Sequence, residues 1–511
     1  MQHLGYVTLQ LIFACIFLSY AGPIKHFEIG VVLSFAPIGA ICIWSAARAW
    51  TNDGYSIRVV FWFFTYWFAF LVPLAAYMTG RWWYGDMSVS QEGRIAYANA
   101  CILAFTSVFS LFYRSGSRRN WPAVWMQRIA NRNPSPTWTF RTIVIAACAA
   151  AGLYAAIGNA MFFRPSDLVQ VSAGEKPLHL LLAYLVRPVP VFALLLGLSR
   201  WLHMGQLRFS SLAFVGVCLL LTNSPTAVAR YYLFGVVYAI IAVAFVGDRL
   251  TKCSSLVLLW GGTFVAFLLH PVRYLGKQYG SLPEIVDAYK GRDIVEYFFD
   301  GHYAAYEIFV IGLQMIEENG LSLGRQVLGT VASWVPRLVW EGKPDHTGKL
   351  IMESAVYRIS NTGYDNISAP VYMESMVDFG WIGLIVFAGL LGYAAGRFDA
   401  VFCELRRVLR TGERKTTGKA LLYAVLAPIP ALSFLFWRGS WMPAFGYLVG
   451  TTISGFLILR FLTANHGSRD VILALDARNA VSTDRVAAHN GQRRSRRSVS
   501  AYWRAGSADS K

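Results

Sequence analysis

Long apolar runs, separated by short polar connections, follow one another from the start of the chain to about residue 463. A bilayer core requires about 20 mainly apolar residues in each membrane-spanning helix. The runs therefore predict an all-α polytopic membrane protein with about twelve transmembrane helices. The expected spans lie near residues 5–21, 28–50, 57–79, 95–113, 140–162, 178–199, 209–223, 230–247, 253–270, 376–396, 419–437 and 442–463.

The first run is short and ends in Ser19-Tyr20-Ala21, which loosely resembles a signal-peptidase site. A secretory signal normally carries Lys or Arg before its apolar segment, and none precedes this one. We therefore expect a retained first span, with a cleaved signal peptide as the alternative.

Basic residues in the connections predict the orientation, because Lys and Arg concentrate in cytoplasmic loops. One cluster follows span four and another follows span ten, and both are even-numbered exits. This pattern places both termini in the cytoplasm. The clusters are Arg114, Arg118, Arg119, Arg128 and Arg132, and then Arg397, Arg406, Arg407, Arg410, Arg414 and Lys415.

Composition agrees with a membrane protein and excludes a soluble enzyme. Of the 511 residues, 56% are hydrophobic and only 14% are charged, whereas soluble domains carry about 25% charged residues. The formal net charge is +18, but the basic residues fall in short loops and one tail, which favours orientation in an anionic membrane over nucleic-acid binding. The seven cysteines show neither CxxC nor Cys/His spacing, so we expect no disulfide and no metal site.

The spans divide the chain into four parts. Residues 1–270 form a membrane domain of about nine helices, and residues 376–463 form one of about three. Between them, residues 271–375 form a large hydrophilic connection that faces the periplasm in this topology. Residues 464–511, which include RRSRR at Arg493 to Arg497, form a basic cytoplasmic tail that we expect to be disordered or held at anionic headgroups.

The large connection itself is expected to be partly helical. Pro283 to Phe299 and His302 to Glu318 have the patterns of amphipathic or interfacial helices. Val327 to Val335 is apolar enough to dip into the membrane. Function is expected in this connection.

Its densest group of polar residues runs from Pro336 to Lys349 and from Asn366 to Gly383. A cationic surface rich in amides and hydroxyls at the membrane surface suits a sugar-bearing diphosphate, because arginine presents a fork of donors and lysine a point charge. The alternative is an ordered loop whose polar groups satisfy its own backbone. The group contains Arg337, Lys343, Asp345, His346, Asn366, Ser368 and Glu374.

Further arginines are expected on the same side. Arg230, Arg273 and Arg438 lie outside in this topology, against the usual distribution of charge, and interfacial anchoring is the alternative role. Arg187 lies within a span beside Pro188 and Pro190, where an arginine costs about 2.5–3.5 kcal/mol. A broken helix holding this cation indicates a nearby anion or a water-filled cavity, with snorkelling or an internal salt bridge as the alternative.

Attack by a sugar hydroxyl on an anomeric carbon bearing diphosphate requires at most one base, because a charge-compensated diphosphate leaves without protonation. Glu374, just above a span, is the first choice among the outer residues, and His302 is the second. We expect Arg337 to bind the diphosphate through paired hydrogen bonds. A capping or salt-bridging role for Glu374 is the alternative.

The residues from Pro336 to Gly383 resemble the oligosaccharide repeat unit polymerases, the Wzy-type O-antigen and exopolysaccharide polymerases. The matching pattern is Pro336-Arg337, Trp340, Lys343-Pro344, Asn366-x-Ser368-x-Pro370, Glu374 and Phe379-Gly380-x-x-Gly383. Arg230, Arg187-Pro188 and Arg438-Gly439 are also similar to that family. In some of its motifs ten residues separate an arginine from a glycine, as they separate Arg337 from Gly348 here.

This resemblance implies a membrane-embedded, GT-C-like, inverting glycosyltransferase that needs neither metal nor cofactor. Its substrate would be an undecaprenyl-diphosphate-linked oligosaccharide in the bacterial inner membrane. A growing chain would pass to the hydroxyl of an incoming repeat unit, releasing the carrier. A chain-length regulator and a separate flippase are the expected protein partners.

Two other functions stay open on the sequence. An O-antigen ligase would perform the same chemistry with a lipid A core as acceptor. A flippase or transporter of a lipid-linked glycan would be expected to show repeats and charges spread through its spans, whereas the charges here gather in one outer connection.

Overall fold

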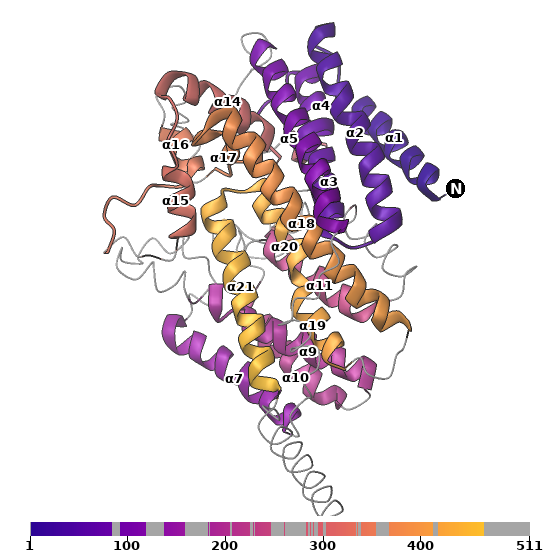
Figure 1. The fold of residues 1–511 in the computed structure, drawn as a ribbon, viewed down its shortest axis with the longest axis vertical. Coiled ribbons are helices and arrows are strands. Elements are labelled where there is room, and N and C mark those ends of the chain that lie inside the picture. The colour runs from indigo at the N-terminus through magenta and orange to yellow at the C-terminus, as the bar shows by residue number, and fades with distance from the viewer. Residues whose placement is uncertain are drawn as a thin grey trace, which may run out of the picture.

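The computed structural model describes most of the chain between residues 2 and 463. The described ranges are 2–83, 92–118, 137–158, 184–204, 207–224, 230–246, 295–299, 303–333, 339–353, 367–411 and 417–463, with single residues or pairs between some of them. Helices make up the described part of the chain, and no strand occurs in it (Figure 1). The tail from residue 464 onward, expected to be disordered, lies outside these ranges.

The first half of the chain forms the helices of the larger predicted membrane domain. They are α1 (Gln2–Tyr20), α2 (Ile29–Asp53), α3 (Ile57–Thr65), the π-helix η1 (Tyr66–Leu71), α4 (Val72–Thr79), α5 (Glu92–Arg118), α7 (Trp138–Ile157), α9 (Pro188–Met204), α10 (Phe209–Thr222) and α11 (Arg230–Ala244).

The second half begins with short helices and ends with long ones. They are the 3-10 helix η4 (Glu296–Phe299), α14 (Ala305–Asn319), α15 (Arg325–Val331), α16 (Thr347–Glu353), α17 (Val371–Val377), α18 (Gly380–Thr411), α19 (Thr417–Leu426), α20 (Pro428–Arg438) and α21 (Trp441–Leu462).

Eight helical stretches among the described residues are long and apolar enough to cross a membrane, which indicates a multi-pass membrane protein. Three shorter apolar helices, α9, α10 and α11, occupy the positions of predicted spans six to eight. The ninth predicted span, 253–270, lies outside the described residues apart from Trp260. The eight are His3–Tyr20, Ile29–Asp53, Ile57–Thr79, Glu92–Arg118, Trp138–Ile157, Gly380–Thr411, Gly418–Arg438 and Trp441–Leu462.

Large apolar side chains cover the outside of the apolar helices. Leu4 of α1 is 70% exposed, Leu220 of α10 is 67% exposed and Leu390 of α18 is 60% exposed. Surfaces of this kind are stable against lipid rather than water, because exposed apolar area is unfavourable in water. The apolar runs of the sequence therefore provide both the interior and the lipid-facing surface.

The third predicted span, Ile57–Thr79, is the most central, and its helix changes pitch midway. Pro73 lies just after the π-helical turn η1. Proline lacks an N–H group and its ring clashes with the carbonyl four residues earlier, so a wider turn relieves the clash.

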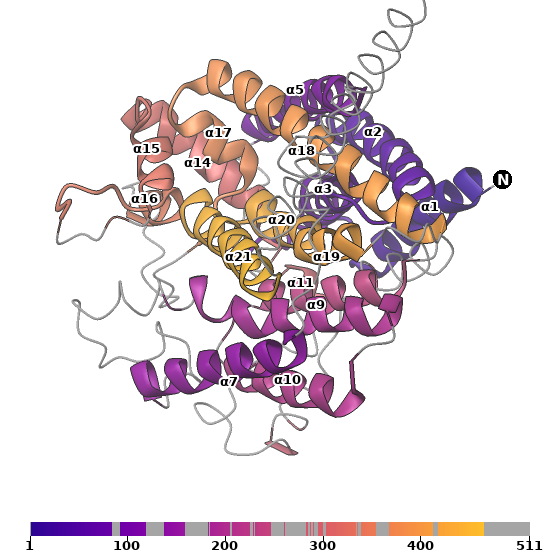
Figure 2. The same cartoon turned by 60° about the horizontal axis from the view of Figure 1, so that its bottom comes forward.

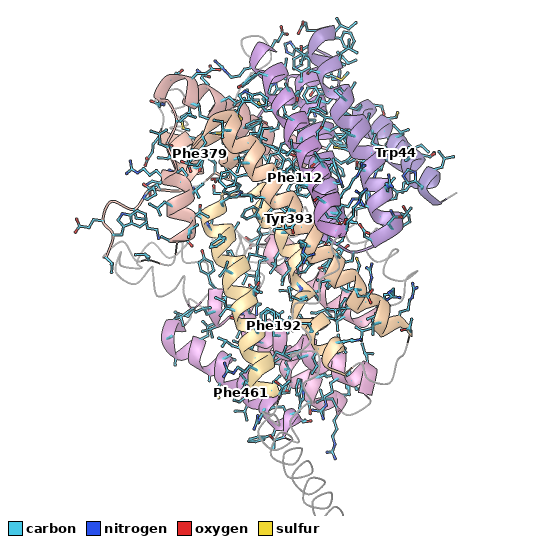
Figure 3. All side chains as sticks on the ribbon, in the orientation of Figure 1. Trp44, Phe112, Phe192, Phe379, Tyr393 and Phe461 are labelled. Atoms are coloured by element: carbon cyan, nitrogen blue, oxygen red, sulfur yellow. The ribbon has the colours of Figure 1, made fainter. Side chains whose placement is uncertain are left out.

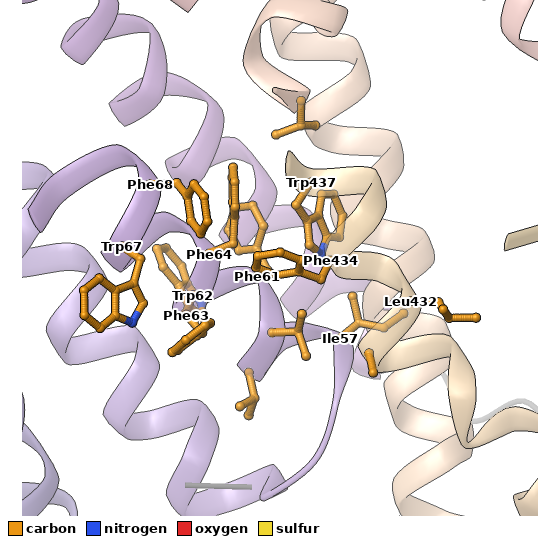
Figure 4. Packing of buried hydrophobic residues seen from close by; sticks show 14 of the residues in the cluster. Ile57, Phe61, Trp62, Phe63, Phe64, Trp67, Phe68, Leu432, Phe434 and Trp437 are labelled. Atoms are coloured by element: carbon orange, nitrogen blue, oxygen red, sulfur yellow. The ribbon is translucent and has the colours of Figure 1, made fainter. Parts of the chain in front are cut away.

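Aromatic rings of α3 and α20 form the centre of the core (Figure 4). The Phe61 ring meets the Trp437 ring edge-on at 5.2 Å between centroids, and it stacks on Phe109 of α5 at 3.9 Å. Phe64 and Phe68 both meet Phe434. Each such pair contributes about 0.5–1.5 kcal/mol beyond its buried area.

The helices α5 and α18 run parallel and in close contact (Figures 1 and 3). A Cβ atom on Gly392 would lie 2.4 Å from the carbonyl oxygen of Phe109, and one on Gly396 would lie 2.2 Å from that of Tyr113. Small residues spaced four apart allow two helix backbones to approach this closely in a membrane. Because the helices are parallel, their arginine-rich C-terminal ends lie on one side, as the basic clusters predicted.

The elements of the large connection lie at the opposite end of α5 (Figure 1). Arg94 in its first turn donates to Glu317 of α14 at 2.8 Å, and Tyr306 of α14 donates to Asn99 at 2.8 Å. Arg114 lies about 30 Å further along α5, since each residue adds about 1.5 Å. That separation is comparable to the thickness of a bilayer core, so α14 and the arginine-rich end of α5 lie at opposite ends of this helix.

Two expectations about the connection need correction. The helix expected at His302 to Glu318 is α14, but every residue from Ala305 to Leu313 is buried, so its first turns are core rather than interfacial. The expected boundary at residue 375 divides α17, which is buried throughout and ends before Gly380, whose φ is +58°. The next span therefore starts at Gly380 instead of residue 376.

A separate group of three helices, α7, α9 and α10, packs beside α21 (Figure 2). Its small interior contains Ala146, Ala193, Val215 and Cys218. Within this group α9 is the helix that also packs against α11, α19 and α21.

Candidate functional site

The short helix α17 holds Glu374 within the protein. Pro370 directly precedes α17 in an extended conformation, with φ −72° and ψ +164°. Gly312 of α14 makes room for Met373, since a Cβ at residue 312 would lie 2.3 Å from the Met373 sulfur. The helix is therefore wedged between α14 and α18, and Glu374 is only 2% exposed.

Two distant segments bind the Glu374 carboxyl. The Thr347 hydroxyl, at the start of α16, donates to Oε2 at 2.7 Å, and the Trp441 backbone N–H, at the start of α21, donates to Oε1 at 3.1 Å. Burial raises the pKa of Glu374 from 4.5 to about 8, although these hydrogen bonds oppose the rise. The carboxyl is therefore largely protonated at neutral pH.

Gly348 allows α16 to lie close to the residues that precede α17 and α21. A Cβ atom there would lie 1.8 Å from the carbonyl oxygen of Ile367 and 3.2 Å from the Ser440 hydroxyl. Ser440 in turn accepts a hydrogen bond from the Ala369 N–H at 3.3 Å. Close packing therefore requires glycine at residue 348, whatever the role of Arg337.

This geometry bears on the expected base. A general base must be ionised and must reach the proton that it removes. In this conformation both Glu374 oxygens are hydrogen-bonded and the carboxyl is protonated at neutral pH. Glu374 here connects α16, α17 and α21, and action as a base requires this arrangement to open.

Arg438, the last residue of α20, lies beside Ser368. Its Nη1 donates to the Ser368 hydroxyl at 3.0 Å, and its guanidinium lies over the Tyr231 ring at 5.0 Å from the centroid. Tyr231 directly follows Arg230, the first residue of α11. The structure therefore brings three expected site residues, Ser368, Arg438 and the backbone of Arg230, to one place.

Arg187 also lies near the start of α11, the helix that Arg438 contacts through Tyr231. The chain turns at Val186 and Arg187, and α9 begins at Pro188, which confirms the helix break expected from the prolines. Arg187 is 4% exposed and lies within electrostatic range of the Tyr232 hydroxyl of α11 and of Tyr447 of α21. Its carbonyl accepts from Asn223 at 3.0 Å.

Arg187 and Arg438 are thus adjacent to consecutive tyrosines at the start of α11. Tyr447 lies six residues into α21, about 9 Å along the helix, so Arg187 lies deeper in the bundle than Arg438. The Tyr232 hydroxyl is buried and has no hydrogen-bond partner in the part of the chain that the structure describes. Buried polar groups normally have partners, so this hydroxyl is an exception among the described residues.

Lys343 has a local structural role. Its ammonium donates to the carbonyl oxygens of Ser333 at 2.7 Å and Val335 at 2.8 Å, which closes the turn after α15. Asp345 pairs with Lys349 at 2.9 Å, and His346 Nδ1 accepts from the Lys349 N–H at 3.2 Å. This part of the expected site matches the alternative of a loop that satisfies its own polar groups.

A polar cavity of about 550 Å³ lies beside this turn. Its volume is within the range of about 300–1,000 Å³ that is usual for small-molecule sites. Residues from the end of α14, from α15 and from the turn before α16 form its walls. Among them are Asn319, Ser322, Arg325, Gln326, Lys343 and Asp345.

Four expected site residues, His302, Arg337, Arg273 and Asn366, lie outside the described residues, as does the side chain of Arg230. Within the described ranges no group of three His, Cys, Asp or Glu could hold a metal ion. The sequence reasoning missed Thr347, Ser440 and Tyr231. Each adjoins a residue that was singled out, but only the fold shows that their side chains bind Glu374, Ala369 and Arg438.

No protein-family model matches the chain, and comparisons with curated proteins and with solved structures also give no match.

Proposed function

We propose that this protein polymerises undecaprenyl-diphosphate-linked oligosaccharide repeat units into O-antigen or exopolysaccharide, as a metal-independent glycosyltransferase of the bacterial inner membrane. The observation that carries the proposal is the convergence of Arg438, Ser368 and the start of α11, with Arg187 deeper in the same region. The side with α14 and α17 would face the periplasm, and both termini would be cytoplasmic.

Charge compensation is the main chemical task in this reaction. The leaving diphosphate gains negative charge as its bond to the anomeric carbon breaks, and preorganised donors stabilise that charge. Arg438 is held in place by Ser368 and Tyr231, so its guanidinium is ordered before a substrate binds. Arg187, Arg230, Arg273 and Arg337 are the further cations proposed for the two lipid-linked substrates.

The polar cavity beside α15 supports a site for sugar. Asn319, Ser322 and Gln326 combine amide and hydroxyl groups with the charges of Arg325 and Asp345. Sugar hydroxyls both donate and accept hydrogen bonds, so a mixed lining of this kind suits them. An incoming repeat unit bound here would lie next to the segments joined by Glu374.

In the proposed reaction, a hydroxyl oxygen of the incoming repeat attacks the anomeric carbon of the growing chain. The new C–O bond forms as the bond to undecaprenyl diphosphate breaks, and the hydroxyl proton passes to a base. Glu374 and His302 are the candidates for that base. Glu374 would first have to exchange its bonds with Thr347 or Trp441.

The test is direct. Purified protein in nanodiscs is incubated with a defined undecaprenyl-diphosphate oligosaccharide, and the products are separated by size. A ladder that increases by whole repeats supports the proposal, and it should persist in EDTA. A single transfer of the chain to a lipid A core would instead identify a ligase. Movement of the substrate across the membrane without a new bond would identify a flippase.

A further inference from the structure

A second basic site lies at the arginine-rich end of α5, away from the region around Glu374. A cavity of about 270 Å³ opens there between the end of α2, the start of α3 and the end of α5. Four arginines and two neutral polar residues line it above Tyr113. They are Arg48, Asn52, Arg58, Arg114, Ser117 and Arg118.

The base of this cavity is rigid. The Tyr113 hydroxyl donates to Asp399 at 2.9 Å, and Asp399 also accepts the N–H groups of Ile57 at 2.9 Å and Arg58 at 3.0 Å. The Arg58 guanidinium lies 5.2 Å from the centre of the Tyr113 ring. Arg406 donates to the carbonyl oxygens of Asp53 and Tyr55, so the connection between α2 and α3 is also held.

The charges in the cavity are not balanced. Among the described residues, its lining contains four arginines and no carboxylate. Asp53 approaches Arg58 at 3.6 Å, but among the described residues no acid pairs with Arg48, Arg114 or Arg118. Like charges held at one place repel, so an anion that enters lowers their electrostatic energy.

We infer that this cavity is a binding site for a phosphate-bearing group, either an anionic lipid headgroup or free inorganic phosphate. Arginine forks match phosphate oxygens in geometry, and Asn52 and Ser117 supply neutral donors. The volume lies just below the usual range of about 300–1,000 Å³ for drug-sized ligands, which suits a group such as phosphoglycerol.

This inference does not rest on the proposed polymerase function. The cavity lies at the C-terminal end of α5, whereas α14 contacts the first turns of that helix. A lipid headgroup is accessible there because the neighbouring surface of α5 includes Leu111, an apolar residue that is 65% exposed. Binding would join α2, α3 and α5 at this surface.

Protection of arginine side chains tests the site. Wild-type protein in phosphatidylcholine nanodiscs is treated with phenylglyoxal, and modification of Arg48 and Arg114 is followed by peptide mass spectrometry. Parallel samples contain phosphatidylglycerol or millimolar inorganic phosphate. We expect one or both to slow modification of the two arginines about ten-fold, equivalent to about 1.4 kcal/mol. Protection by phosphatidylglycerol alone identifies a lipid site, and protection by phosphate alone identifies an ion site.

Two controls separate a built site from general attraction to a basic surface. Arg407 lies near the end of α18 but outside the cavity, where Glu404 holds it at 2.7 Å, and its reactivity should change little. Asn52→Asp should abolish protection by placing a negative charge among the arginines, whereas Thr411→Asp, at an exposed position at the end of α18 and outside the cavity lining, should preserve it. Absence of protection, equal protection of Arg407, or protection that survives in folded Asn52→Asp would overturn the inference.

Discussion

The Thr347 hydroxyl donates a 2.7 Å hydrogen bond to the Glu374 carboxyl, which joins the start of α16 to α17 inside the protein. With the Trp441 N–H on the other oxygen, one buried carboxyl connects three segments that are far apart in the sequence. Stability and any catalytic rearrangement of this region therefore depend on the same side chain.

Stability should depend on pH through Glu374. Its pKa rises from 4.5 when exposed to about 8 when folded, so between these values the folded protein holds a proton that the unfolded chain releases. Stability is therefore highest below pH 4.5, falls as pH rises to about 8 and then levels off, by on the order of 5 kcal/mol at most. Melting temperatures in detergent across this range should decline for wild type and decline less for Glu374→Gln. Equal slopes for both proteins would show that Glu374 does not titrate in this way.

Gly348→Ala should destabilise the protein, because the added methyl would lie 1.8 Å from the Ile367 carbonyl oxygen. Overpacking of this kind costs about 1–3 kcal/mol, and a backbone obstacle leaves little scope for relaxation. Thermal unfolding measures the loss. Gly342→Ala is the matched control, since the nearest atom to its new methyl would be 3.9 Å away. Similar melting temperatures for the two variants would contradict the close approach.

Arg438→Lys should insert and fold normally but reduce polymerisation by about ten- to a thousand-fold, because lysine keeps the charge and loses the planar fork. Product length on gels, normalised to protein level, is the measurement. Arg407→Lys, at an exposed ion pair with Glu404, should have no effect. A stable Arg438→Lys protein that makes long polymer at the wild-type rate would remove Arg438 from the proposed site.

Asp399→Ala should lower the free energy of unfolding by more than about 2 kcal/mol, because two backbone N–H groups and the Tyr113 hydroxyl lose their buried acceptor. Tyr113→Phe removes a single hydrogen bond and should cost about 1 kcal/mol. Urea or thermal denaturation in micelles can rank the two. Tyr393→Phe, a half-buried tyrosine on α18 for which the structure shows no hydrogen bond, should change stability by less than about 0.5 kcal/mol.

Topology can be tested with two introduced cysteines. Gly342 and Thr411 are both exposed, and they lie in the large connection and at the end of α18, respectively. If the connection faces outward, a cysteine at 342 should react with an impermeant thiol reagent in intact spheroplasts, and one at 411 should react only after lysis. The reverse pattern would show that the orientation is opposite to the one predicted. Labelling of both cysteines in intact spheroplasts would contradict the proposed number of spans between them.

The sequence determined the membrane character, most helix positions and the break before Pro188. These features are local: a run of apolar residues has the length of a bilayer, and a proline removes a donor wherever it occurs. The clusters near Arg114 and Arg406 likewise predicted that α5 and α18 end on one side, because charge is distributed relative to the membrane and not to other helices.

Only the tertiary structure decided which polar residues meet. Glu374 was singled out as an acid near a span, but its burial and its bonds to Thr347 and Trp441 depend on how α16, α17 and α21 pack. The pairing of Arg407 with Glu404 follows from their spacing of three residues on one helix, whereas the contacts of Arg438 with Ser368 and Tyr231 join distant segments. Residue 348 must be glycine only because the Ile367 carbonyl oxygen lies against it. A contact between distant segments depends on the packing of the whole chain, and so it has no signature in the residues on either side.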